Sequence, residues 1–381
     1  MDENQPSYLE QTLSLPCKNC GSQLYYSAKI HKLHCEHCGN TEEINPANDQ
    51  VVEHSLAHAM QQAREYSPED IGKKVFGCEN CGAHFMVESS KDVKVECGFC
   101  GSQNVNLEAH KHQFIQPMGI IPFFISRAEG MSQFKEWIKK GWFHPGKLKK
   151  LASVEKLHGI YLPFWTYDAQ TESDWRGEAG YYYYETKRVR RNGQWETVRV
   201  QKVRWVRRSG HLSHFFDDVL VLGSGVINQE DIERIFPFHL KELVNYDPRL
   251  LVGWEAEVYD IEVDAGYHIA DRQMDQKIHR MCSSQLGGDT QRGLRVSTQK
   301  SRQTFKHIIL PIWISSYRYK NKVFRFLING QTGKVYGKKP LSVGKIALAV
   351  IAGLLIAAGI YIAADWKNVQ VYLQEFQRGN Y

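Results

Sequence analysis

Near the N-terminus the sequence reads Cys17-Lys18-Asn19-Cys20-Gly21 and then Cys35-Glu36-His37-Cys38-Gly39, with 14 residues between the inner cysteines. A second unit reads Cys78-Glu79-Asn80-Cys81-Gly82 and then Cys97-Gly98-Phe99-Cys100-Gly101, with 15 residues between its inner cysteines. Zinc takes four soft ligands at tetrahedral corners, and a two-residue spacer lets one tight turn supply two of them. The repeat therefore predicts two structural zinc ions, each held by four thiolates.

Each cysteine pair is followed by glycine, which suits a turn position that requires positive φ. The alternatives to metal binding are disulfide bonds and a redox-active dithiol, and the spacing and the repetition favour metal over both. Residues 1–16 do not resemble a signal peptide, so we expect the cysteines to stay in a reducing compartment. Four nearby histidines are left out of the ligand sets because four cysteines already complete each site: His31, His34, His37 and His84.

The two cysteine units define the organisation of the N-terminal third. Gln23–Tyr26 and His84–Val87 are predicted to be short strands, which makes each unit a pair of hairpins clamped by its ion. We expect a flexible N-terminus over 1–16, zinc ribbons over 17–50 and 73–110, and a linker helix over 51–72. The apolar residues that recur at helical spacing in this linker are Val52, Leu56, Met60 and Ala63. Their stripe packs either on the body or on a partner.

The composition is that of a globular protein with more than one folded unit. The chain has 381 residues, of which 42% are hydrophobic and 24% are charged, and its formal net charge is +6. This mild positive charge suits an anionic membrane surface, a nucleic acid or an acidic protein without choosing among them.

A long apolar segment lies near the C-terminus. Residues 346–364 contain no charged side chain, and at 1.5 Å per residue they span roughly 28 Å, close to the hydrocarbon thickness of a bilayer. The alternative is a buried core helix, but such helices are seldom apolar on every face. We expect one transmembrane helix over 343–366 and a short extracytoplasmic tail over 367–381. Four lysines precede the segment and only Lys367 follows it closely, which places the N-terminal bulk on the cytoplasmic side of a bacterial inner (plasma) membrane.

Residues 111–340 are expected to form a mixed α+β body. Helices are predicted after Ser126, which opens a capping-box pattern, after Asn228 and after Asp264. Strands are predicted over 159–167, 254–263 and 308–328, with a hairpin that ends in the turn 329–333. Two similar phrases, Tyr161-Leu162-Pro163-Phe164-Trp165 and Leu310-Pro311-Ile312-Trp313, are interpreted as corners of the core, with a ligand pocket as the alternative.

A basic hairpin is the segment that we expect to meet a partner. Residues 185–208 hold nine lysines and arginines against two glutamates, and Arg191-Asn192-Gly193-Gln194 is a strong hairpin turn. This hairpin suits anionic headgroups, a protein surface or a nucleic-acid backbone, and a solvated arm is the alternative. The candidate anion-binding residues are Lys187, Arg188, Arg190, Arg191, Arg199, Lys202, Arg204, Arg207 and Arg208.

No catalytic constellation is found, so we do not expect an enzyme. The chain lacks the phosphate-binding loop of nucleotide-driven motors, the His-Glu-x-x-His pattern of metalloproteases and the Gly-x-Ser-x-Gly pattern of hydrolases. Cys282 stands alone in a predicted helix and is interpreted as a small core residue instead of a nucleophile.

The doubled cysteine units, the phrase from Leu310 to Trp313, the run from Val323 to Gly333 and the apolar C-terminal helix resemble a bacterial family of zinc-ribbon membrane proteins. These are often described as TFIIB-type zinc-ribbon (zinc-finger) proteins, or labelled like primosomal protein N′ (replication factor Y). The motor residues of that helicase are missing here. The resemblance implies a part of a membrane-associated assembly, in some cases linked to flotillin-like scaffold proteins.

Two functions from different classes follow. The first is a non-enzymatic adaptor, anchored by the C-terminal helix, whose ribbons present rigid loops to other proteins. The second is a zinc-ribbon nucleic-acid-binding protein of replication or transcription that uses the basic hairpin.

Overall fold

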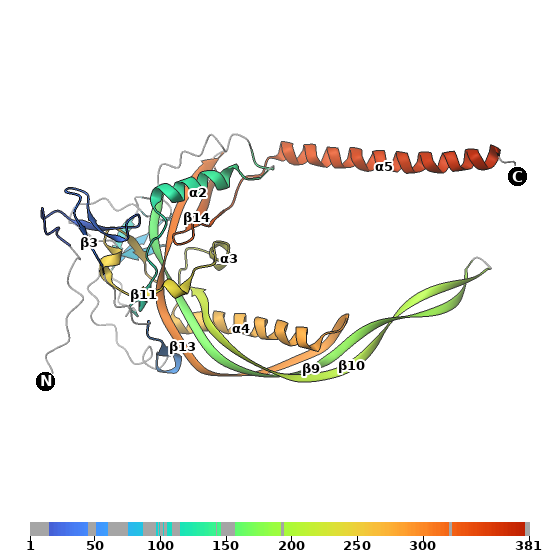
Figure 1. Ribbon diagram of the computed structural model, residues 1–381, viewed down its shortest axis with the longest axis horizontal. Coiled ribbons are helices and arrows are strands. Elements are labelled where there is room, and N and C mark those ends of the chain that lie inside the picture. Colours follow the sequence, from blue (N-terminus) through green and yellow to red (C-terminus); the bar gives the residue numbers. More distant parts are fainter. Residues whose placement is uncertain are drawn as a thin grey trace.

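Three very long strands organise the molecule (Figure 1). They are β9 (His158–Arg191), β10 (Gln194–Leu222) and β13 (Thr290–Tyr319). β9 lies between the other two and is antiparallel to both. Ordinary strands have about 5–6 residues, so these are several times longer than usual. The fold is therefore mixed, as expected, but strands dominate it.

The structure is a computed structural model that describes residues 15–44, 51–59, 75–86, 97, 99, 102, 105–108, 115–141, 143–145, 157–191, 194–319 and 322–377. Most of its shorter strands join the long ones in one large mixed sheet. These are β4 (His54–Ser55), β5 (Val75–Cys78), β6 (His84–Met86), β7 (Val105–Glu108), β8 (Gly119–Ile120), β11 (Val244–Asn245), β12 (Glu255–Glu257), β14 (Lys322–Asn329) and β15 (Val335–Gly337). A separate sheet contains β1 (Leu24–Ser27), β2 (Lys32–Cys35) and β3 (Thr41–Glu42).

The two proline phrases lie opposite each other in the middle of the sheet. Leu162 faces Leu310, and Pro163 and Pro311 face Ile309 and Tyr161 on the neighbouring strand. The phrases are buried, as expected, but they are strand interiors and not corners.

A proline lacks the N–H that a central strand normally donates, so its position in the sheet needs an explanation. On one side β9 changes neighbour here, from β12 at residues 160–161 to β10 from residue 164. β13 likewise changes from β8 at residues 308–309 to β14 from residue 312. Each proline therefore occupies the gap between two neighbours, where no ladder bond from its nitrogen is required.

The three helices predicted for the body are present, but one of them begins earlier than predicted. α2 (Arg127–Lys139) starts with the full capping box between Ser126 and Glu129, and α3 (Gln229–Glu233) starts at the predicted cap Asn228. α4 (Val263–Leu286) begins earlier than predicted: Glu262 is its cap, and Asp264 lies in its first turn. Two short 3₁₀ helices, Leu240–Glu242 and Pro248–Leu251, complete this set.

α4 packs on the long strands through one face. Its buried residues recur every three or four positions, and Cys282 is among them, so its predicted role as a core residue is confirmed. Burial also raises the pKa of the Cys282 thiol.

Two sequence predictions are wrong in part. The strand predicted over 254–263 is only β12, because the N–H groups of Asp260 and Ile261 both turn to the carbonyl of Gly223. The linker predicted as a helix over 51–72 begins as strand β4, which pairs with β13, and becomes helical over 56–59. Leu56 packs in the core, whereas Val52 is exposed. Residues 60–72, with Met60 and Ala63, lie outside the described part.

A charge network around the buried side chains of Lys306 and Asp168 links Glu53, beside β4, to the long strands. Asp168 on β9 accepts hydrogen bonds from the Asp218 backbone N–H (2.5 Å) and the Thr304 hydroxyl (2.9 Å), which lie beside bulges in β10 and β13. The ammonium of Lys306 contacts Asp218 (2.7 Å) and Glu53 (3.1 Å). Lys306 and Asp168 are buried, and burial raises the pKa of Asp168 to about 6.

The last helix, α5 (Val343–Gln377), extends away from the body as a single projecting helix (Figure 1). Its first 21 residues, Val343–Ala363, are long and apolar enough to cross a membrane, and none of this stretch is buried against the protein. The predicted tail begins inside this helix, which continues to Gln377.

We expect Lys306→Met to destabilise the fold by about 3–5 kcal/mol at pH 7.5, because it leaves three carboxylates around a buried site without their cation. The loss should shrink towards pH 5. The pKa of Asp168 in the folded chain lies above that of an ordinary aspartate, so protonation on acidification removes repulsion from the folded state. Urea denaturation of the detergent-solubilised protein, followed by tryptophan fluorescence, measures this difference.

Lys300→Met is the matched control. Lys300 also contacts two aspartates, Asp271 and Asp275, but neither of them is buried as Asp168 is. Its loss should be smaller. An equal loss for Lys306→Met at pH 5 and pH 7.5 would contradict the proposed balance of charges.

Candidate metal centres and the basic arm

The first four predicted ligands meet in space. Cys17, Cys20, Cys35 and Cys38 place their sulfur atoms within 4.8 Å of one another. The Cys17–Cys38 and Cys20–Cys35 sulfur separations are both 3.5 Å. Tetrahedral coordination with bonds of about 2.3 Å requires sulfur separations of about 3.8 Å, whereas a disulfide requires about 2.05 Å. These cysteines are free thiols whose geometry fits one tetrahedral metal ion.

One hydrogen-bonded turn repeats at the cysteine pairs. The N–H of the first cysteine donates to the carbonyl five residues later, from Cys17 to Ser22, Cys35 to Asn40, Cys78 to Ala83 and Cys97 to Ser102. In the first three turns, the N–H of the following glycine donates back to that cysteine's carbonyl. Gly21, Gly39 and Gly82 all have φ near +75°, as the sequence predicted. Gly101 lies outside the described residues.

Electrostatics in the first cluster favour a bound cation. Hydrogen bonds from the side chain and backbone of Ser22 lower the pKa of Cys20 to about 5. The pKa of Cys35 is instead raised to about 11: hydrogen bonding from the Cys38 backbone favours its thiolate, but burial and the neighbouring sulfurs outweigh this. Four thiolates this close repel one another, so a divalent cation is needed for all four to ionise.

The second cluster follows the same plan in the part that is described. The sulfur atoms of Cys78, Cys81 and Cys97 also lie within 4.8 Å of one another, and the Cys81–Cys97 separation is 3.6 Å. The fourth predicted ligand, Cys100, lies outside the described residues. Of the nearby histidines, His84 contacts Asp260 at 3.1 Å.

Both cysteine units are attached to the body. In the first, the Tyr26 N–H donates to the Val252 carbonyl, and the indole N–H of Trp254 donates to the Tyr26 carbonyl, each at 3.1 Å. In the second, β6 pairs with β12 and so joins the large sheet. Cys20 and Cys38 nevertheless remain exposed on the outer side of the first unit.

The predicted basic hairpin is a projecting ribbon. We call residues 181–191 and 194–204 the arm, because β13 ends its pairing with β9 at Gly180 and only two strands continue beyond it (Figure 1). Gln194 pairs with Arg191, as a two-residue turn requires, although residues 192–193 lie outside the described part.

The nine predicted anion-binding residues do not form one cluster. Alternate residues of a strand point to opposite faces. Cross-strand register places Arg188, Arg190, Arg199 and Arg207 on one face, and Lys187, Lys202, Arg204 and Arg208 on the other. Several contact other groups: Lys202 pairs with Glu185, Arg207 with Glu178, and Arg208 with the Leu286 carbonyl. The side chain of Arg191 lies outside the described part.

Sequence reasoning missed three arginines beside this hairpin. Arg176 precedes the basic segment on β9, while Arg292 and Arg295 lie on β13, about 90 residues further along the chain. Pairing of β13 with β9 places Arg292 opposite Glu178, which also pairs with Arg207, and Arg295 opposite Arg176. The available signal was the run Arg292-Gly293-Leu294-Arg295, but no local pattern indicated which strand it would join.

We expect the double substitution Cys20→Ser with Cys38→Ser to lower bound metal by about one ion per chain, because two thiolates are too few to hold a structural ion. Both side chains are exposed, so the change disturbs the core little. Elemental analysis of the purified, reduced protein measures the ratio. Cys282→Ala is the control and should leave the metal content unchanged. Metal-free wild-type protein would contradict the assignment.

Comparison with known proteins gives one informative match. An uncharacterized protein of Bacillus subtilis strain 168, YdjG, is 27% identical over 360 residues, which cover 92% of this chain and 96% of that protein. No family model matches the chain. No solved structure matches it either. The similarity thus extends along nearly the whole chain.

Proposed function

We propose that this chain is a membrane-anchored adaptor of a bacterial plasma-membrane assembly, with two structural zinc ribbons on the cytoplasmic side. It is non-enzymatic in this proposal. The observation that carries it is α5: its 21-residue stretch Val343–Ala363, apolar enough to cross a membrane, projects from a folded body that covers none of it. Exposing such a stretch to water is costly, and a lipid bilayer removes that cost.

The charges beside α5 support the proposed orientation. Lys339 donates to the carbonyl of Lys140 at 2.9 Å and lies 4.0 Å from the centre of the Trp137 ring. Lys339 thus holds the segment that leads into α5 against the body. Lys338 and Lys345 lie in the same segment. Such a cluster on the N-terminal side favours a cytoplasmic body.

The cysteine units support the adaptor role. Their inner sides are packed on the body, whereas the first unit exposes both Cys-x-x-Cys turns, together with Tyr25 and Ile30. A metal-clamped turn is a rigid element that can be recognised with little loss of conformational entropy. As the resemblance to zinc-ribbon membrane proteins implies, the partners are other proteins of the assembly, with flotillin-like scaffold proteins as candidates.

We expect Leu354→Arg with Leu355→Arg to release the protein from membranes. Each charge near the centre of a span costs about 2.5–3.5 kcal/mol. Alkaline carbonate extraction of membranes should leave wild-type protein in the pellet and move the variant to the supernatant. Val343→Arg is the control, since a charge at the end of the span can reach the headgroups. A wild-type chain that is soluble without detergent would exclude the anchor.

We expect Cys35→Ser with Cys38→Ser to abolish co-purification of partner proteins while membrane insertion is kept, because the ribbon unfolds without its ion. Gentle detergent extraction, affinity capture and identification of the bound proteins test this. Cys282→Ala again serves as the control. Unchanged partner recovery despite the loss of zinc would refute the adaptor role of the first ribbon.

A further inference from the structure

An arginine-rich face lies at the base of the arm, on the side of the sheet opposite α4. α4 covers the other side: a Cβ on Gly177 would come within 2.8 Å of Leu286, and Arg208 donates to the Leu286 carbonyl at 3.2 Å. Residues 176 and 178 therefore point to the uncovered face, as do their cross-strand partners Ser209 and Arg207.

A β-bulge adds two more arginines to this face. In a regular strand Arg292 and Arg295 would point to opposite sides. The register of β13 shifts between them at Gly293, which has φ +64°, so that Arg292 pairs with Glu178 and Arg295 pairs with Arg176. Both therefore share the uncovered face. We call Arg176, Arg207, Arg292 and Arg295 the arginine face.

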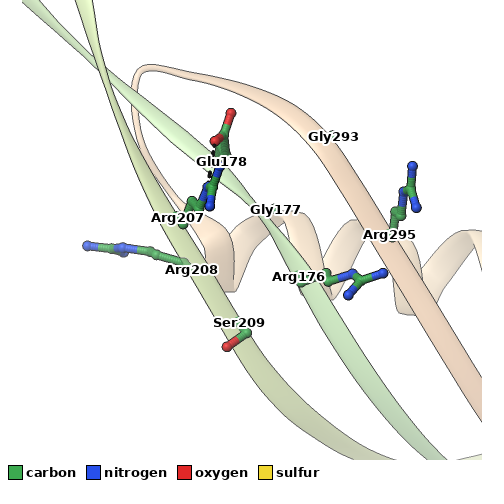
Figure 2. Close-up of a pocket in the computed structure, with 8 residues that line it drawn as sticks. All are labelled: Arg176, Gly177, Glu178, Arg207, Arg208, Ser209, Gly293 and Arg295. Carbon is green, nitrogen blue, oxygen red and sulfur yellow. Dashed lines mark hydrogen bonds and ion pairs between the residues drawn. The ribbon is translucent and has the colours of Figure 1, made fainter.

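Three residues of the arginine face, Arg176, Arg207 and Arg295, line a hollow of about 500 Å³ together with Arg208, which gives it an excess of positive charge (Figure 2). Glu178 is the acidic residue that lines it, and this carboxylate contacts both Arg207 and Arg292. Within the described part of the chain, Arg176 and Arg295 have no ion-pair partner. Figure 2 shows the Arg176 and Arg295 guanidinium groups extending from neighbouring strands, while Arg208 points away. Two uncompensated guanidinium groups at one hollow suit a phosphate group, which guanidinium binds through paired hydrogen bonds.

Aromatic residues continue from this face along the arm. Arg292 lies 4.1 Å from the centre of the Trp205 ring, and Arg199 lies 4.1 Å from that of Tyr184. Trp195, near the end of the arm, is 65% exposed. Arginine interleaved with exposed tryptophan and tyrosine is typical of segments at the headgroup level of a bilayer.

The arm and α5 leave the body in the same general direction (Figure 1). The arm extends beside α5 to about the far end of that helix, so a bilayer entered by α5 is within reach of the arm (Figure 1). The arm carries charges on both faces, which excludes it from the hydrocarbon, so its binding in the headgroup layer requires α5 to enter the bilayer at an angle to the arm. A nucleic acid would also match arginine and aromatic residues, but nothing in this arrangement brings one to the arm.

We propose that the arginine face and the arm bind the phosphate groups of anionic phospholipids in the membrane that α5 enters. This inference rests on the proposed anchoring. It gives the protein a second membrane contact, made of strands, beside the helix.

Hydrogen exchange of the full chain in lipid nanodiscs tests the proposal. A two-stranded ribbon is only marginally stable, so its amides exchange readily unless it is bound. We expect exchange across residues 181–204 to slow at least tenfold when phosphatidylcholine discs are replaced by discs with about 30% phosphatidylglycerol. The effect should disappear at about 1 M salt, where charges are screened beyond about 3 Å.

Arg176→Gln with Arg295→Gln should remove most of this lipid-dependent protection. The matched control is Arg272→Gln with Arg280→Gln, which removes the same charge from exposed positions of α4, on the other side of the sheet, and should keep it. Equal exchange in both kinds of disc, or equal loss in both variants, would overturn the proposal. So would stronger protection by a single-stranded oligonucleotide added to phosphatidylcholine discs, because that favours a nucleic-acid site.

This design tests the proposed anchor and the proposed role of the arginine face separately. A chain that enters neither kind of disc contradicts the anchor. In that case, co-sedimentation of the full chain with phosphatidylglycerol vesicles still measures the arginine face, and equal binding of wild type and Arg176→Gln with Arg295→Gln would refute it.

Discussion

The antiparallel pairing of β9 with β13 is the constraint on which the rest of the structure depends. It runs from Ile314 opposite His158 in the body to Thr290 opposite Gly180 at the base of the arm. Every backbone N–H and C=O group in the buried centre of this pairing must form a hydrogen bond, since an unpaired polar group there is costly. Pro163 and Pro311 meet this condition because each lies where its strand changes neighbours. The same two gaps set where the pairing of β12 and β8 stops and where β10 and β14 end, at Leu222 and Asn329.

The cysteine units take their positions from this sheet. The second unit extends it through β12, and the first is held beside it by Trp254, which also stacks on Phe123 in the core. A metal ion supplies folding energy to a small unit, but it does not orient that unit on a body. Here backbone pairing and a buried indole do so. The first unit lies on the side of the body away from the direction in which α5 and the arm extend (Figure 1).

Local signals predicted the parts of the fold that local chemistry determines. The capping box at Ser126, the glycines after the first three cysteine pairs and the apolar C-terminal helix each depend on neighbours in sequence, and each was found. The length of β9 was missed because Asp168 to Glu178 reads as polar, although a third strand and α4 cover this stretch. The segment from Trp254 to Val263 was predicted as a strand because it is rich in apolar residues. These residues are buried by packing on the body, and only β12 pairs in a sheet. The arginine face could not be predicted, since Arg295 reaches Arg176 only through pairing across more than 100 residues.

In the proposed adaptor, two membrane contacts would restrict the orientation of the body relative to the bilayer, which one contact cannot do. A single helix leaves a protein free to rotate about the bilayer normal and to tilt, so the distance of its far side from the membrane varies. A second contact through the arm would restrict the tilt, because the arm, the arginine face and the body share the strands β9 and β10. The metal-clamped turns, attached to the same sheet, would then be held at a defined height above the lipid. An adaptor that presents its binding turns at a fixed height recruits its partner at a smaller entropic cost than a flexible tether does.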